Sequence, residues 1–200
     1  MVLVNTTEPV LAAVPTGLRG RVASIGIGSA AVPSFDVDNA AGAGAVLRHL
    51  YDSGRRRIAM VTGPRWLSCA GRSVTAYRAL MRAADLPVRL VAGDFSAPGA
   101  AGRRWRPSPG GRTRRDLRGQ RRHRARGDLR AAGARDRGAG DVAVAGFDDI
   151  PYAAVSTPAL TTATHPVRRI ATAAATAVLD GRRVPPVTAF PSTLVARESA

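Results

Sequence analysis

The sequence predicts an α/β fold built on a parallel sheet. Short, mainly apolar runs recur along the chain, at residues 2–4, 22–27, 58–61, 88–92 and 142–145. The run at 142–145 has no polar residue, which is typical of a strand that is buried on both faces, as strands are in parallel sheets. Helical patterns separate several of these runs, and this alternation is characteristic of parallel α/β domains. A chain of 200 residues is long enough for one domain or for two small lobes.

Three amphipathic helices are predicted. The first begins at Asp38 or Asn39, either of which can cap it, and its apolar residues follow helical spacing: Ala43, Val46, Leu47, Leu50 and Tyr51. The second covers about residues 70–84 and is stopped by Pro87. The third covers about residues 166–180, between a proline suited to a first turn and a glycine suited to a helix end. Residues 9–20 are interpreted as an irregular connection, because proline and glycine interrupt them.

Positive charge is concentrated in one segment. The chain has 30 basic residues, all arginine, and 14 acidic residues, which gives a net charge of +16. Residues 101–139 hold 14 of these arginines and only three aspartates, so this segment alone carries +11. Such a composition buries too little apolar surface to offset its ordering entropy, and we expect disorder or loose attachment there. The basicity is therefore local.

The cellular location is predicted from the cysteine content and from the lack of an apolar segment long enough to cross a membrane. The single cysteine, Cys69, excludes an internal disulfide and fits a reducing compartment. No apolar run is long enough to cross a bilayer, and the first residues lack the basic leader of a signal peptide. We expect a cytoplasmic protein without a membrane partner.

The stretch DVAVAGFDD, residues 141–149, is the strongest candidate for a ligand contact. Its apolar run ends at Gly146 and is followed by Phe147, Asp148 and Asp149. Ligands of open α/β sheets bind just beyond the carboxyl ends of strands. An acid there can accept hydrogen bonds from hydroxyl or amino groups, and the ring can stack on an apolar ligand face. The alternative is that both acids only cap the turn before Pro151.

Motifs in a fixed order extend this interpretation to nearly the whole chain. They are VLVN at 2–5, VDNAAGAGAVLRHLYDSGRRRIAMVTGP at 37–64, AYRALMRAADLP at 76–87, GDFS at 93–96, DVAVAGFDDIPYA at 141–153, PALTT at 158–162 and PSTLVARES at 191–199. In order and spacing the set resembles the LacI/GalR family of bacterial transcriptional regulators, in the part that senses the effector. The resemblance implies a two-lobed fold like that of type I periplasmic sugar-binding proteins. It also implies a small-molecule effector, a sugar above all, and a homodimer in intact relatives.

Against the family pattern, the fold is expected to be incomplete. The family's DNA-reading helix-turn-helix and the first sensor strands precede the point that Met1 occupies here, so we expect a truncated sensor that lacks its own DNA contact. By the same analogy, residues 1–35 form a remnant of the first lobe. Residues 36–158 form the second lobe, and residues 159–200 return to the first.

Three effector-binding residues are predicted. Asp148 matches the first acid of the family's G-[FY]-D-D motif, which binds hydroxyl or amino groups of the effector, and Phe147 is the aromatic before it. Arg72 lies one residue from the position of the family's effector-binding arginine, four before the aromatic Tyr77. One residue of shift turns a helical side chain by about 100°, so Arg72 either reaches the effector after a local adjustment or is a surface arginine.

Residues 101–140 replace a strand and a helix that the family has before Asp141. Codons for residues 116–128, read one base later, permit TFAANDAIARGA, which is close to the family's own motif. We therefore hypothesise that about 101–140 are translated out of frame, and resequencing of the gene tests this. The alternative takes the arginines at face value, as a segment that binds nucleic acid without sequence preference.

An enzyme is not expected. The three histidines and Cys69 show no metal-ligand spacing, and no nucleophile or phosphate-loop motif is present, so neither a metal nor a cofactor is predicted. The leading function is the effector sensor of a LacI/GalR-type regulator. The alternatives are a sugar-binding protein of the transport type and a degraded product that binds nucleic acid incidentally.

Overall fold

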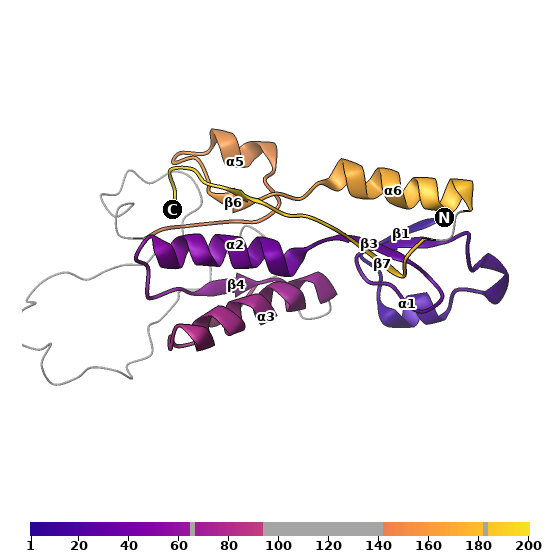
Figure 1. Ribbon diagram of the computed structural model, residues 1–200, viewed down its shortest axis with the longest axis horizontal. Coiled ribbons are helices and arrows are strands. Elements are labelled where there is room, and N and C mark those ends of the chain that lie inside the picture. The colour runs from indigo at the N-terminus through magenta and orange to yellow at the C-terminus, as the bar shows by residue number, and fades with distance from the viewer. Residues whose placement is uncertain (65–66, 94–141, 182–183) are drawn as a thin grey trace, which may run out of the picture.

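The computed structural model describes residues 1–64, 67–93, 142–181 and 184–200. It is elongated, with two lobes side by side along its long axis (Figure 1). The sheet lobe contains β1 (Val2–Val4), α1 (Glu8–Ala12), the short 3-10 turn at Thr16–Leu18, β2 (Ala23–Ile25), β3 (Ser34–Val37), α6 (Val167–Asp180) and β7 (Val187–Phe190). The helix lobe contains α2 (Asn39–Asp52), β4 (Met60–Thr62), α3 (Ser68–Ala83), β5 (Leu90–Ala92), α5 (Pro151–Val155), β6 (Thr162–Ala163) and β8 (Leu194–Val195).

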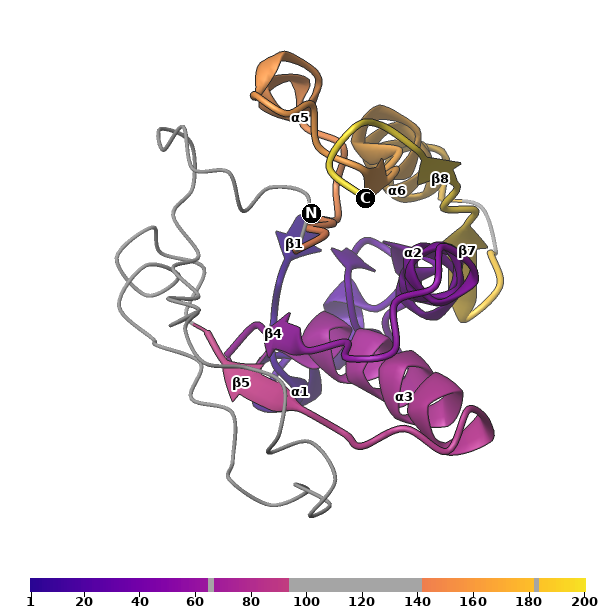
Figure 2. The ribbon, with the colours of Figure 1, turned by 90° about the vertical axis from the view of Figure 1, so that its left-hand side faces the viewer.

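The sheet lobe is one parallel sheet covered on both faces. Its strand order is β1-β2-β3-β7, and every neighbouring pair is parallel. Successive strand residues point to opposite faces. Ala23 therefore packs under α6 with Phe35 and Ile170, whereas its neighbour Val22 packs with Leu11 of α1. Figure 2 shows α6 and α1 on opposite sides of these strands.

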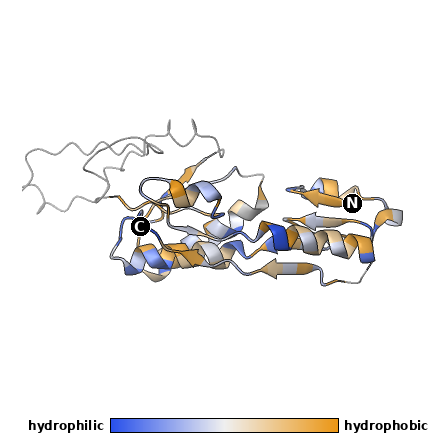
Figure 3. Ribbon diagram, turned by 90° about the horizontal axis from the view of Figure 1, so that it is seen from above, coloured by the Kyte–Doolittle hydropathy of each residue, from blue (hydrophilic) through white to orange (hydrophobic). Residues whose placement is uncertain are grey.

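The helix lobe depends on the packing of α2 against α3. Asp38 caps α2, because its carboxylate accepts a hydrogen bond from the Ala41 N–H at 2.9 Å. The buried residues between the two helices and the β4–β5 pair are Leu47, Ile58, Tyr77 and Met81. The hydropathy colouring in Figure 3 shows hydrophobic and hydrophilic residues alternating along the helices of the molecule, as is typical of amphipathic helices.

The segment after Asp141 differs from the prediction. Residues 142–145 form a single parallel bridge, from Ala145 to Thr161, in place of a strand. Val142 is 58% exposed and Val144 is 41% exposed, so the expected strand buried on both faces is wrong. Thr161 and Ser199 bind this segment along one side through backbone hydrogen bonds. In the part of the chain that the structure describes, no element covers its other side.

Most other elements agree with the prediction. The strands at 2–4 and 22–27 and the helices that begin near 39, 70 and 166 are confirmed, and the runs at 58–61 and 88–92 give strands that begin two residues later. The sequence did not predict β3, β6, β7, β8, α1 or α5. The hypothesis about residues 101–140 concerns residues outside the described part.

The division into residues 1–35, 36–158 and 159–200 stays a prediction. Within 159–200, α6 and β7 pack on the sheet lobe. In contrast, β6 and β8 contact α2, and Ser199 binds Val144. Residues 159–200 are thus shared between the lobes. Within the described ranges no helix is long and apolar enough to cross a membrane.

Candidate functional site between the lobes

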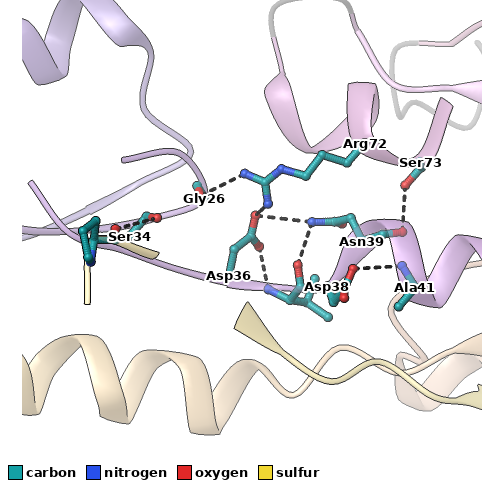
Figure 4. A network of polar contacts seen from close by, with 10 residues as sticks. Gly26, Ser34, Asp36, Asp38, Asn39, Ala41, Arg72 and Ser73 are labelled. Atoms are coloured by element: carbon teal, nitrogen blue, oxygen red, sulfur yellow. Dashed lines mark hydrogen bonds and ion pairs between the residues drawn. The ribbon is translucent and has the colours of Figure 1, made fainter. Parts of the chain in front are cut away.

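Arg72 joins the two lobes through a network of polar contacts (Figure 4). Its Nη1 atom lies 2.8 Å from Asp36 Oδ2, and its Nη2 atom donates to the carbonyl oxygen of Gly26 at 3.3 Å. Asp36 lies on β3 and Gly26 directly follows β2, both in the sheet lobe. Arg72 lies near the start of α3, in the helix lobe. The guanidinium group therefore bridges the two lobes, and its role as an effector contact stays a prediction.

Residues beside Asp36 hold its carboxylate in place. The Val37 N–H donates to Asp36 Oδ1 at 2.8 Å, and Asn39 Nδ2 donates to Asp36 Oδ2 at 3.3 Å. The same amide group of Asn39 also donates to the Val37 carbonyl oxygen at 3.1 Å. The turn from β3 into α2 therefore fixes the acid before any ligand arrives, which reduces the ordering cost of binding.

The pKa of Asp36 is raised above its ordinary value of 3.8. Burial is the main cause, since Asp36 is only 6% exposed and its charged form is poorly solvated. The positive charge of Arg72, the Val37 N–H and the charge of His165 lower the pKa in part. Carboxyl groups perturbed in this way are concentrated at functional sites.

Asp148 is the open acid of the DVAVAGFDD stretch. Its Oδ1 atom lies 2.9 Å from His165 Nδ1, and its side chain is 56% exposed. Asp149 is paired instead with Arg197, at 2.7 Å, and its side chain is 24% exposed. Both acids have positive φ, +84° and +45°, a conformation that residues other than glycine rarely adopt and that is often found at binding sites. Asp148 can thus accept further hydrogen bonds, whereas Asp149 serves an ion pair.

Phe147 lies in a different environment from the acids. Its ring is half-buried and packs against the core under α6. It also lies against Gly42 of α2, where a Cβ atom would come within 2.8 Å of the ring. The structure therefore places Phe147 where the helix lobe touches the sheet lobe. Its role as an effector contact stays a prediction.

His165 connects the two acidic positions. It lies between β6 and α6, where the chain crosses from one lobe to the other (Figure 1). It binds Asp148 directly, and it is close enough to Asp36 for its charge to affect the pKa of that group. The junction thus contains two charged pairs, Arg72 with Asp36 and His165 with Asp148, which we refer to together as the polar region.

Asp36, Asn39 and His165 were not predicted from the sequence as residues of the site. Asp36 lies on β3, which was not predicted because polar residues interrupt its apolar pattern. His165 lies three residues after the last residue of the PALTT motif, and nothing in that spacing indicated its role. Among the described residues, no group of three or more histidine, cysteine or acidic side chains could hold a metal ion.

A hollow lies away from this polar region. It has a volume of about 600 Å³ and lies between α6 and the strands β3 and β7, where Phe35, Val184 and Phe190 form an apolar floor. It contains neither Asp148 nor Arg72.

Comparison with solved structures shows the same fold in sugar-bound regulators. The transcriptional regulator CelR, solved with cellobiose, is 21% identical and has a TM-score of 0.68; the match covers 100% of this chain and 65% of that one. A periplasmic binding protein/LacI transcriptional regulator from Alkaliphilus metalliredigens, solved with D-xylulofuranose, is 15% identical, with a TM-score of 0.68 and coverage of 99% and 76%. A regulatory protein of the LacI family from Chloroflexus aggregans is 17% identical, with a TM-score of 0.70 and coverage of 99% and 75%.

The chain thus spans somewhat less than two thirds of the CelR chain. No curated protein matches the sequence significantly. Residues 47–200 match the family described as the periplasmic binding protein-like domain, which is more than half of the chain. The parallel α/β architecture and the matched residues agree, and the chain belongs to the periplasmic binding protein-like domain family.

Proposed function

We propose that this chain is the effector-sensing domain of a LacI/GalR-type transcriptional regulator and that its effector is a sugar. The observation that carries the proposal is the presence of two charged pairs, Arg72 with Asp36 and His165 with Asp148, where the lobes join. Family membership and the likeness in fold to sugar-bound regulators support it. We expect the protein to act in the cytoplasm, as transcription requires.

The chemistry of the polar region suits a sugar. Each sugar hydroxyl can donate one hydrogen bond and accept others. The carboxylates of Asp36 and Asp148 accept only, and the Arg72 guanidinium donates only, so together they can satisfy both halves of a hydroxyl group. A few fixed polar groups of this kind give a binding site its orientation and its specificity.

Binding at this position would change the arrangement of the lobes. The chain crosses between them at residues 37–39, 163–167 and 190–194 (Figure 1). A sugar that contacts Arg72 in one lobe and Asp36 in the other binds some arrangements more tightly than others, and it shifts the population accordingly. In a homodimeric regulator of this family, such a shift would change DNA affinity through the helix-turn-helix, a coupling between two sites.

A thermal-shift screen with a sugar panel, including cellobiose and D-xylulose, tests the proposal. At least one sugar should raise the Tm of the wild-type protein, because it binds only the folded state. Asp148→Ala should lose this shift, whereas Asp52→Ala should keep it, since Asp52 is exposed at the far end of α2. A shift that Asp148→Ala leaves intact would contradict the assigned site. No shift with any sugar would contradict the function.

A further inference from the structure

His165 is held rigidly at the crossing between the lobes. The preceding residue, Thr164, is fixed by the neighbouring crossing. The Thr164 N–H donates to the Thr193 carbonyl oxygen at 2.9 Å, and the Thr164 carbonyl oxygen accepts from Ser192 Oγ at 2.7 Å. The His165 carbonyl oxygen accepts from the Val167 N–H at 2.8 Å as α6 begins. The imidazole therefore projects from a backbone that is fixed on both sides.

The imidazole of His165 is paired with one of the two carboxylates of the polar region. It contacts Asp148 at 2.9 Å, and its charge is felt by Asp36 in the sheet lobe. Asp36 has Arg72 as an ion-pair partner, whereas Asp148 is paired, within the described residues, with His165 alone. With a neutral imidazole, Asp36, Asp148 and Arg72 carry a net charge of −1, and with a protonated one the region is neutral.

On the basis of the proposed function, we propose that His165 is a positioning residue of the sugar site: it aims the Asp148 carboxylate, and its protonation accompanies sugar binding. A sugar between the lobes displaces water from both carboxylates. This displacement costs less when each acid has a cation beside it, because an unpaired charge is expensive to desolvate. The sugar therefore binds more tightly to the protonated form.

Other charged groups near His165 do not replace it. Arg197 is occupied by Asp149 at 2.7 Å. Arg168 and Arg169 begin α6 just after the crossing; both are exposed, and Arg169 lies over the ring of Phe190 at 5.8 Å. Histidine is also the side chain whose charge changes most readily near neutral pH. The pH dependence of binding is thus assigned to His165.

Calorimetric titration with cellobiose and D-xylulose at about pH 6 and about pH 8 tests this proposal. The wild-type protein should bind about fivefold more tightly at the lower pH. This value is at the low end of the range typical of coupling between two binding events, because the side chain of Asp148 is half exposed to solvent. His165→Gln keeps a donor for Asp148 but cannot take up a proton, so it should bind without pH dependence. His165→Ala should lose affinity at both pH values. His49→Gln, on α2, is the control and should behave as wild type.

Two outcomes of the titration separate this inference from the proposed function. Equal pH dependence of sugar binding in wild type and His165→Gln would overturn the inference and leave the proposed function intact. Absence of binding by any sugar would overturn the proposed function and, with it, the inference that rests on it.

Discussion

The two lobes are stabilised in different ways. In the sheet lobe, four parallel strands form one sheet, and separate apolar clusters cover its two faces. In the helix lobe, the described strands occur as the pairs β4–β5 and β6–β8, and the core depends on α2 against α3. In the sheet lobe, the exposed strand residues Val4 and Val187 lie on the edge strands β1 and β7. In the helix lobe, Val142 and Val144 are exposed although the sequence predicts that their segment is buried. The comparison indicates that α2 and α3 bear most of the stability of the helix lobe.

The largest expected effect lies in the sheet lobe. Ile170 is 1% exposed and packs between α6 and the sheet, so Ile170→Ala should lower the free energy of unfolding by about 4 kcal/mol. Val167→Ala, on the same helix at a 58% exposed position, should change it by about 0.5 kcal/mol or less. Urea denaturation followed by circular dichroism measures both. Equal effects would show that α6 does not cover the sheet.

The next prediction concerns the helix lobe. The hydroxyl group of Tyr77 donates to the Ile58 carbonyl oxygen at 2.9 Å and accepts from the Arg89 N–H at 2.8 Å, which ties α3 to the ends of both strands. Tyr77→Phe leaves these buried groups without that partner and should cost about 2 kcal/mol. Tyr152→Phe, at an exposed position, is the matched control and should be neutral. A neutral Tyr77→Phe would mean that packing alone holds α3.

The contact between the lobes can be tested with two glycines of α2. A Cβ atom on Gly42 would meet Ser192 Oγ, far inside van der Waals contact, and the Phe147 ring at 2.8 Å, whereas one on Gly44 meets nothing within 4 Å. Gly42→Ala should therefore destabilise the protein by about 1–2 kcal/mol. Gly44→Ala should stabilise it by about 0.5–1 kcal/mol, because alanine favours helix. If both substitutions stabilise the protein, α2 does not touch Phe147 and Ser192 in solution.

The smallest expected effect concerns Asp36 and depends on pH. Since burial raises its pKa above 3.8, the charged form is disfavoured in the folded state, and the stability due to Asp36 is lost as the pH rises through the folded pKa. Asparagine resembles the neutral form. Asp36→Asn should therefore melt a few degrees above wild type near neutral pH and at the same temperature in acid. A lower Tm near neutral pH would show that attraction by Arg72 outweighs burial.

The sequence predicted the elements whose pattern is local. Continuous apolar runs identify β1 and β2, and helical spacing with a capping acid identifies α2. The strand β3, with the sequence SFDV, was missed because Asp36 interrupts its apolar residues. Its burial depends on Arg72, 36 residues away. The run at 142–145 shows the opposite error: a buried strand was predicted there, and the segment is exposed. An apolar sequence does not reveal whether a neighbouring element covers it.

The same distinction between local pattern and long-range contact applies to the residues of the candidate site. Asp148 and Arg72 were predicted from motif spacing, and the structure places both where the lobes meet. The one-residue shift of Arg72 does not keep it from the junction, since a long side chain reaches Asp36 from that position. The partners Asp36 and His165 could not be predicted, because their roles arise from contacts between distant parts of the chain.

A double-mutant cycle in sugar affinity tests the central claim most directly, that Arg72 and Asp148 act on one ligand at the junction between the lobes. Calorimetry of wild type, Arg72→Gln, Asp148→Asn and the double variant measures it, with the sugar that gives the largest thermal shift. Each single change should weaken binding by about tenfold to a hundredfold, as loss of a hydrogen bond to a charged group does. The double variant should lose less than the product of the two effects, because the groups share a ligand. Unchanged affinity in either single variant would contradict the account.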